Sequence, residues 1–138
     1  MIIFENNFIP FGGYKYFNFF SILFTKSKDK LTDKDKNHER IHNRQMLELA
    51  IIGILILFIT CIFTDISLFY SILGVFLFYV WYGIEYLLIM AFHNSQHENY
   101  HDVSLEEEAY LNDDNLEYLK NRKWFNWLKY IKPKSYNE

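Results

Sequence analysis

The residues with the clearest chemical potential are His38, Glu39 and His42, which form the pattern H-E-x-x-H within NHERIHNRQ (37–45). On a helix, two histidines four residues apart lie on one face, about one turn from each other. Two such imidazoles can bind one zinc ion, each at about 2.0 Å. Glu39 is placed to accept a proton from a zinc-bound water, whose pKa the metal lowers toward about 7. The resulting hydroxide would attack a carbonyl carbon while the metal stabilises the oxyanion.

A catalytic zinc site needs a third protein ligand and leaves one position for water. The first region that could supply this ligand is SLEEEAY (104–110), where Glu106, Glu107 and Glu108 follow the second apolar stretch of the chain. The second candidate is Glu85, the one charged residue within that stretch. A carboxylate in a membrane segment is usually functional or paired, so Glu85 is a candidate for the site even if it is not a ligand.

Three roles are open for Glu85. It could bind the metal, accept a hydrogen bond that orients a ligand histidine, or form an ion pair with Arg40 or Arg44. We expect the orienting or the ion-pair role, with Glu106 as the third ligand. A second histidine series at spacing four lies among polar residues that favour a loop, and we expect no metal there: His93, His97 and His101.

The helix that would position the motif has a recognisable start. Thr32 followed by Asp35 fits a capping box, which predicts a helix that begins near Asp33. No proline interrupts the chain from there to Pro133. The sequence therefore predicts one active-site helix over 33–63, which carries the motif and continues into the apolar run LAIIGILILFITCIF.

Two apolar stretches, 49–63 and 68–92, are separated by the short connector TDIS. The second would form about 37 Å of helix, enough to cross a hydrocarbon core of about 30 Å. The first would form about 22 Å and reaches that thickness only if it is counted back to Met46, which places the motif at the rim of the membrane. Both stretches are apolar on all faces, which favours a two-helix membrane hairpin over a buried hairpin in a soluble bundle.

The charges set the expected orientation and exclude some functions. All 14 Lys and Arg residues lie outside the two apolar stretches and their connector. The positive-inside rule therefore predicts a multi-pass protein of the inner (cytoplasmic) membrane, in contact with membrane lipid, with both termini cytoplasmic. The net charge of −3 gives no case for nucleic acid. Cys61, the only cysteine, excludes an internal disulfide and a zinc site built on several cysteines.

The flanking segments complete a single domain over 1–138. Residues 1–31 are rich in Ile, Phe and Tyr and are broken by Pro10 and two glycines, so we expect YKYFNFF and SILF to pair as a β hairpin. Residues 104–132 predict cytoplasmic C-terminal helices with Ser104 as an N-cap. Within them, the amphipathic KWFNWLKYIK suits either the headgroup zone of a membrane or a packed terminal helix. The expected fold is mainly α with a small N-terminal β hairpin.

NHERIHNRQ, the apolar hairpin and SLEEEAY together resemble the membrane-embedded gluzincin metallopeptidases of the CAAX-prenyl-protease and stress-protease type. In those families two histidines of H-E-x-x-H bind zinc together with a glutamate on a later helix, in a pattern like F-E-x-x-A-D. Leu105 takes the Phe position, Glu106 the ligand position and Ala109 the Ala position, whereas Tyr110 stands where these families have Asp. Most of the chain is also similar to a group of short, uncharacterised bacterial membrane proteins. They share segments like H-E-R-I-H, W-Y-x-I-E-Y (here WYGIEY, 81–86) and F-E-R-E-A-Y.

The first resemblance implies a zincin-like minimal domain and a zinc-dependent membrane metallopeptidase. Its Zn2+ ligands would be His38, His42 and Glu106, with Glu39 as the base. Its substrate would be a peptide or membrane-protein segment near the cytoplasmic membrane surface. The chain is much shorter than those proteases, so a homo-oligomer or a partner would complete the cleft, and YFNFFSILF is the candidate edge strand to align the substrate. Two alternatives stay open: a non-catalytic zinc-binding membrane sensor or assembly module, and a structural hairpin without a metal.

Overall fold

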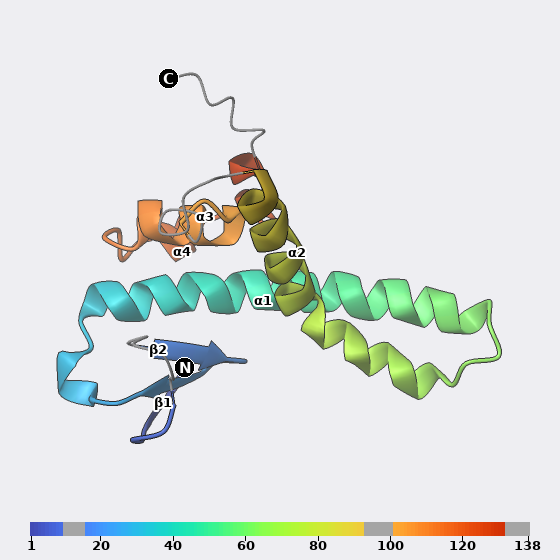
Figure 1. The fold of residues 1–138 in the computed structure, drawn as a ribbon, viewed down its shortest axis with the longest axis horizontal. Helices are drawn as coiled ribbons and strands as arrows, with labels where there is room; N and C mark the ends of the chain where they lie inside the picture. Colours follow the sequence, from blue (N-terminus) through green and yellow to red (C-terminus); the bar gives the residue numbers. More distant parts are fainter. Residues whose placement is uncertain (10–15, 93–100, 132–138) are drawn as a thin grey trace.

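The computed structural model describes residues 1–9, 16–92 and 101–131. The longest element is helix α1 (Asp33–Ile62), and the other elements are arranged along it (Figure 1). A small sheet and the C-terminal helices flank the first half of α1, and an apolar hairpin extends along its second half. The turn expected at Pro10 lies outside the described residues.

The N-terminal sheet contains the predicted hairpin and one further strand. Its strands are β1 (Ile2–Glu5), β2 (Tyr16–Phe19) and β3 (Ile22–Thr25), in the order β1-β3-β2. β2 and β3 are antiparallel and joined by a two-residue turn at Phe20 and Ser21, whose φ angles of 45° and 68° are the left-handed values that such a turn requires. β1 pairs parallel with β3. The sequence does not predict this pairing, because a parallel pair joins distant segments and leaves no short-range turn signal.

Helix α1 begins where the sequence predicts. The Asp35 carboxylate accepts the backbone N–H of Thr32 at 2.8 Å, and the Thr32 hydroxyl accepts the backbone N–H of Asp35 at 3.1 Å, so both halves of the capping box are formed. A short 3₁₀ helix, η1 (Lys28–Lys30), leads from β3 to this cap. The helix then runs for 30 residues through the H-E-x-x-H motif into the apolar stretch, which confirms the predicted continuity.

The second apolar stretch is bent, whereas the sequence predicts one continuous helix over 68–92. Its first part is a 3₁₀ helix, η2 (Leu68–Phe76), and its second part is α2 (Leu77–Phe92). η2 runs back along α1, and α2 then turns away and crosses it (Figure 1). The two backbones touch at Gly53 and Gly74, where a Cβ atom added to either glycine would collide with the backbone of the other. Beyond the bend, α2 packs on Met46 and Leu49 of α1 and also on the C-terminal segment at Trp127.

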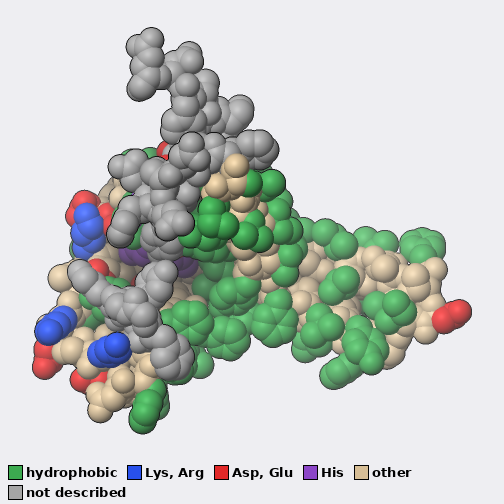
Figure 2. Space-filling model, in the orientation of Figure 1, with side chains coloured by type: hydrophobic (Ala, Val, Ile, Leu, Met, Phe, Trp, Pro, Cys, Tyr) green, Lys and Arg blue, Asp and Glu red, His purple; other side chains and the backbone are tan. Residues whose placement is uncertain are grey.

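Two helical stretches, Asp33–Ile62 and Leu68–Ala91, are long and apolar enough to cross a membrane. Many of their large apolar side chains are exposed, including Leu55 at 54% and Phe69 at 76%. Figure 2 shows hydrophobic side chains over the hairpin, apart from one acidic side chain at its tip, and charged side chains gathered at the opposite end of the molecule.

The predicted C-terminal helices are present as three short elements. They are α3 (Ser104–Asn112), α4 (Tyr118–Asn121) and the 3₁₀ helix η3 (Asn126–Tyr130). Ser104 is the first residue of α3 and Val103 is its N-cap, so the predicted cap is wrong by one residue. The predicted end at residue 132 lies outside the described part of the chain.

The hydrophobic core lies where α1, α2, α3 and η3 meet. Its buried members are Met46, Leu49, Phe78, Val103, Leu105 and Trp127. The segment KWFNWLKYIK does not present one apolar side, because Trp127 is buried while Trp124, Leu128 and Ile131 are exposed. The core therefore fixes α3 against the first half of α1, which is the arrangement that builds the candidate site.

Candidate metal centre

Three of the side chains predicted to bind a metal lie close together in the structure. His38 and His42 lie one turn apart on α1, and Glu106 reaches them from α3. The Nε2 atoms of the two histidines are 3.1 Å apart, and Oε2 of Glu106 is 3.4 Å from each of them. This group could hold a metal ion.

The spacing of these three atoms is that of a metal's ligand sphere. In a tetrahedral site with metal–ligand bonds of about 2.0–2.1 Å, the ligand atoms stand about 3.3–3.4 Å from one another. The side chains are largely withdrawn from solvent, with exposed fractions of 13% for His38, 8% for His42 and 5% for Glu106. Among the described residues, no donor makes a well-formed hydrogen bond to the buried Oε2 of Glu106. A buried carboxylate oxygen directed at two imidazole nitrogens, without another well-formed hydrogen bond, has the geometry of a cation site.

The charge of His42 and the charge of Glu106 depend on each other. Burial by itself lowers the pKa of His42, but the neighbouring Glu106 carboxylate outweighs it and raises that pKa to about 9. Burial by itself raises the pKa of Glu106, but the two histidines outweigh it and hold that pKa well below its usual range. Without a metal the cluster is therefore an ion pair, and a metal must displace the proton on His42 because a coordinating imidazole is neutral.

His42 is oriented by Gln45, one turn further along α1. Nδ1 of His42 is 2.8 Å from Oε1 of Gln45. The Gln45 amide nitrogen donates to the carbonyl oxygen of Leu105 at 2.9 Å and to Oε2 of Glu108 at 2.8 Å. Since these two acceptors fix the amide nitrogen, Oε1 must face His42 and accept a hydrogen bond from Nδ1–H. The Nε2 lone pair of neutral His42 then points at the candidate metal position.

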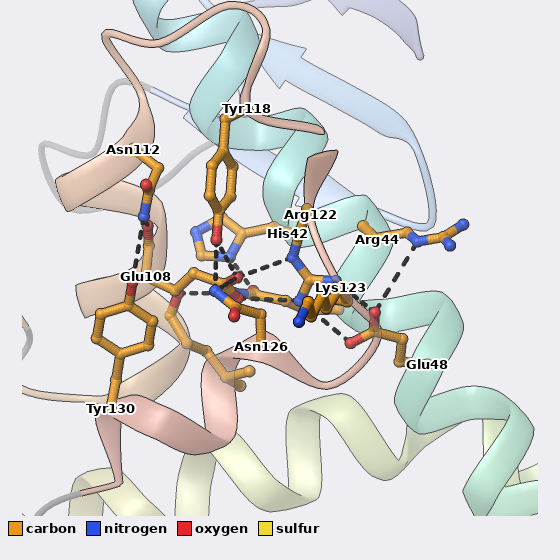
Figure 3. A network of polar contacts seen from close by, with 12 residues as sticks. His42, Arg44, Glu48, Glu108, Asn112, Tyr118, Arg122, Lys123, Asn126 and Tyr130 are labelled. Carbon is orange, nitrogen blue, oxygen red and sulfur yellow. Dashed lines mark hydrogen bonds and ion pairs between the residues drawn. The ribbon is translucent and has the colours of Figure 1, made fainter. Parts of the chain in front are cut away.

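Glu108 connects this contact to a buried network of polar side chains (Figure 3). Its carboxylate also accepts hydrogen bonds from Tyr118, Arg122 and Asn126. The guanidinium of Arg122, 1% exposed, lies between Glu108 and Glu48 of α1 and donates to both. Burial raises the pKa of Glu108, but the Arg122 hydrogen bonds outweigh it and keep that pKa below its usual range. The network ties the C-terminal segment to both helices that carry the candidate ligands.

The other two candidate ligands also have orienting partners. Nδ1 of His38 is 3.5 Å from Oδ2 of Asp113, which forms an ion pair with Lys34 at 3.2 Å. The Tyr82 hydroxyl donates to Oε1 of Glu106 at 3.2 Å, which leaves Oε2 directed at the histidines. A carboxylate or amide behind each metal-binding imidazole is the usual arrangement around protein metal ions.

Tyr110 lies against the cluster, although it replaces the Asp of the pattern that the sequence resembles. Its ring centroid is 4.6 Å from that of His38, and the ring centroid of His101 is 4.3 Å from that of Tyr110. The carboxylate nearest to His38 Nδ1 comes instead from Asp113. His93 and His97, the other members of the second histidine series, lie outside the described residues.

Glu39, the candidate base, is buried beside the two histidines. It is 8% exposed, and its charge contributes to the raised pKa of His42. Its backbone carbonyl accepts a hydrogen bond from Nδ2 of Asn18 at 3.1 Å, which attaches β2 to this turn of α1. The carboxylate is thus near enough to His42 to influence its charge, and it does not belong to the three-ligand group.

Glu85 has a different role from the three considered from the sequence. Its carboxylate accepts the backbone N–H of Ser104 at 2.8 Å, the Ser104 hydroxyl at 2.7 Å and the indole N–H of Trp81 at 3.1 Å. A carboxylate at a helix N-terminus is favoured by the exposed N–H groups there. Glu85 therefore fixes the start of α3, two residues before Glu106, while Arg44 stacks on Trp124 at 4.2 Å.

Several contributors to the site are not predicted from the sequence. The spacing of Gln45 could have suggested its contact with His42, because a residue three positions further along a helix lies on the same face. No such signal points to Asp113 or Tyr82, because tertiary packing alone brings them to His38 and Glu106. Glu107, named as an alternative ligand, contributes no atom to the three-ligand group.

Comparisons with protein-family models, curated proteins and solved structures gave no match. Function is therefore inferred from the geometry of the cluster and from the apolar hairpin beside it.

Proposed function

We propose that this chain is a zinc-dependent, membrane-bound metallopeptidase whose site lies at the cytoplasmic surface of the inner membrane. His38, His42 and Glu106 would bind Zn2+, and Glu39 would act as the general base. The observation that carries the proposal is the mutual spacing of 3.1–3.4 Å among the three buried ligand atoms, with Glu39 on the same turn. Two imidazole nitrogens, one carboxylate oxygen and tetrahedral spacing favour zinc over harder cations, which prefer oxygen ligands.

The chain's own groups match the needs of peptide hydrolysis. A bound zinc would supply Lewis acidity and acidify a water molecule. Glu39 would accept the proton of that water and pass it to the leaving amine. The Gln45 and Asp113 contacts would keep both imidazoles in the tautomer whose Nε2 faces the metal, and the Tyr82 contact would hold the carboxylate of Glu106.

The position of β2 supports a peptide as substrate. β2 is at one edge of the sheet and lies beside the motif, since Asn18 donates to Glu39 O and, at 3.0 Å, to Oδ1 of Asn43. In a hairpin closed by a two-residue turn, the backbone groups of alternate residues point away from the partner strand. On β2 these are Tyr16 and Asn18. The Tyr79 hydroxyl donates to the Asn18 carbonyl at 3.4 Å, so an extended peptide that pairs with this edge and passes near the metal would replace that contact.

The apolar hairpin supports the membrane placement. The second half of α1 and η2 expose large apolar side chains on several faces, and the molecule's charges gather at the opposite end (Figure 2). Lys and Arg are absent from 49–92, so we propose that the hairpin enters the membrane from the cytoplasm and that both described ends of the chain remain there.

The experiment that tests the proposal compares a Glu39→Gln variant with the wild-type protein in lipid vesicles. We expect Glu39→Gln to keep one equivalent of zinc and to lose hydrolysis of a fluorogenic peptide library, because only the base is removed. Glu117→Gln, at an exposed position, is the control and should retain both properties. Hydrolysis that survives in Glu39→Gln would contradict the proposed base.

The same measurement distinguishes the peptidase from the second candidate function, a non-catalytic zinc-binding sensor or assembly module. The network from His42 through Gln45 and Glu108 to Arg122 favours this candidate, because it would link metal binding to the packing of the C-terminal segment. Stoichiometric zinc in the wild-type protein without cleavage of any library peptide would support the module over the peptidase.

A further inference from the structure

We propose that α2 lies along the membrane surface and does not cross the bilayer, and that its outer face binds the phospholipid of the leaflet next to the metal centre. This inference rests on the membrane placement proposed above, and it is independent of the metal and of hydrolysis. It follows from what contacts the two faces of α2.

The inner face of α2 contacts the C-terminal elements through both apolar and polar side chains. Trp81 packs on Trp127 of η3 with ring centroids 5.3 Å apart. Tyr82 donates a hydrogen bond to Glu106. Glu85 accepts hydrogen bonds from the start of α3. The whole segment from Trp81 to Glu85 is therefore attached to α3 and η3.

These contacts limit the orientation that α2 can adopt relative to a bilayer. Its first turn is also attached, because the ring of Phe78 lies 6.1 Å from that of His42. From Phe78 to Glu85 the helix advances by about 10 Å. If α2 stood across the membrane, α3 and the network around Arg122 would enter the hydrocarbon with it. Charged side chains are expensive there, and the irregular backbone between short helices would lose hydrogen bonds to water. With α2 along the surface, these polar elements stay on the aqueous side.

The outer face of α2 is an apolar stripe. Val80, Ile84, Leu87 and Leu88 recur at helical spacing, and they are 51%, 54%, 57% and 54% exposed. The one charged residue of α2, Glu85, is on the inner face. A helix with one apolar face and one polar or protein-covered face, lying where a membrane hairpin emerges, has the pattern of an interfacial helix.

Lipid fits this stripe better than a second protein. In the space-filling view the apolar surface of α2 continues onto the hairpin without a band of charge between them (Figure 2). On the hairpin, exposed apolar side chains occur at successive positions around α1, such as Leu55, Ile56 and Phe58 at 54%, 55% and 42%. A partner protein would cover one side of such a projection, whereas acyl chains surround it on all sides.

This arrangement would fix the depth of the candidate metal centre relative to the membrane surface. Tyr82 and Glu85 reach from the lipid-bound helix directly to Glu106 and to the start of α3. Lipid contact on one face of α2 is thus separated from a candidate metal ligand by the width of the helix, about 10 Å, and one side chain. The centre would act on backbone segments that lie at the level of the headgroups.

The test measures the depth of nitroxide labels in the full-length protein. Cys61 is first replaced by Ala, and single cysteines are then placed at Val80, Ile84 or Leu87, which share one helix face. The protein is reconstituted into vesicles of phosphatidylethanolamine and phosphatidylglycerol, and depth is obtained from the accessibility of each label to oxygen and to a water-soluble nickel chelate. We expect equal depths at the three positions. Depths that change steadily, by about 10 Å from 80 to 87, would show a spanning helix and overturn the proposal.

Matched labels on α1 show that the method can detect a gradient. Ile51, Leu55 and Ile62 also share one face, and their depths should change by about 16 Å in total if the hairpin enters the membrane. Aqueous readings at all α1 positions would overturn the membrane placement and the surface orientation of α2 together. If the α1 labels lie in lipid and the depth of the α2 labels changes steadily along the helix, only the surface orientation of α2 would be overturned. The helical circular-dichroism signal, measured on each labelled protein, checks that the fold is retained.

Discussion

Nδ1 of His42 lies 2.8 Å from Oε1 of Gln45, and this contact joins the candidate metal centre to the buried network around Arg122. A hydrogen bond at this position selects which imidazole nitrogen is free to bind a metal. The arrangement makes the properties of the centre depend on residues that do not touch the metal position.

The contact itself can be tested by replacing Gln45 with Leu. We expect zinc affinity to fall about 10- to 100-fold, because His42 loses the acceptor that fixes its tautomer and ring orientation. Competition with a fluorescent zinc chelator measures the change. Arg40→Ala, an exposed substitution on the same helix, is the control and should bind zinc as the wild-type protein does. Equal affinity in Gln45→Leu and Arg40→Ala would show that Gln45 does not position the ligand.

Replacement of Arg122 with Met should destabilise the protein. The substitution leaves two carboxylates, Glu48 and Glu108, buried without their shared cation, and breaking such a pair typically costs about 3–5 kcal/mol. Denaturant unfolding in detergent micelles measures the free energy of unfolding. Lys123→Met, at the neighbouring exposed position, should change it by less than about 0.5 kcal/mol. Similar values for the two variants would contradict the importance of the network.

The contact between α1 and η2 predicts a contrast among three glycines. Gly53→Ala and Gly74→Ala should each destabilise the protein by about 1–3 kcal/mol, because the new Cβ atom collides with the opposing backbone. Gly83→Ala should be neutral or stabilising by up to about 1 kcal/mol, because a Cβ atom there meets nothing within 4 Å and alanine favours the helix. Thermal unfolding of the three variants in micelles gives the comparison, and a loss at Gly83 equal to the other two would refute it.

The ion pair in the metal-free centre predicts how stability depends on pH. The pKa of His42 is raised from 6.5 to about 9, so its contribution is complete below pH 6.5 and is lost as the pH rises toward 9. The pKa of Glu106 is lowered, so its contribution is present above its ordinary pKa and is lost as the pH falls below it. Metal-free protein should therefore unfold at a higher temperature at pH 6 than at pH 9. In His42→Ala this difference should shrink, and an unchanged difference would assign it to other groups.

Local signals in the sequence predict part of this structure. The capping box at Thr32 and the absence of proline predict the start and the length of α1, and the spacing of His38 and His42 predicts that they share one helix face. All three features are found. Glu106 also lies where the predicted hairpin return would bring it. These features depend on neighbours in sequence or on one reversal of the chain, which is why a pattern can reveal them.

Other features depend on contacts between distant residues, and no local pattern encodes them. The sequence does not predict the parallel pairing of β1, the bend between η2 and α2, or the contact between Glu85 and Ser104. The bend has the largest consequence, because our proposal that α2 lies along the membrane surface rests on the polar contacts of Tyr82 and Glu85. The metal, the hydrolysis and the membrane orientation stay predictions.

The metal content of the purified protein tests the central proposal most directly. The chain is purified in detergent, incubated with a slight excess of zinc, dialysed and examined by elemental analysis beside His38→Ala and Arg40→Ala. We predict one equivalent of zinc in the wild-type protein and in Arg40→Ala, and none in His38→Ala. No zinc in the wild-type protein, or the same content in His38→Ala, would contradict a metal centre at His38, His42 and Glu106.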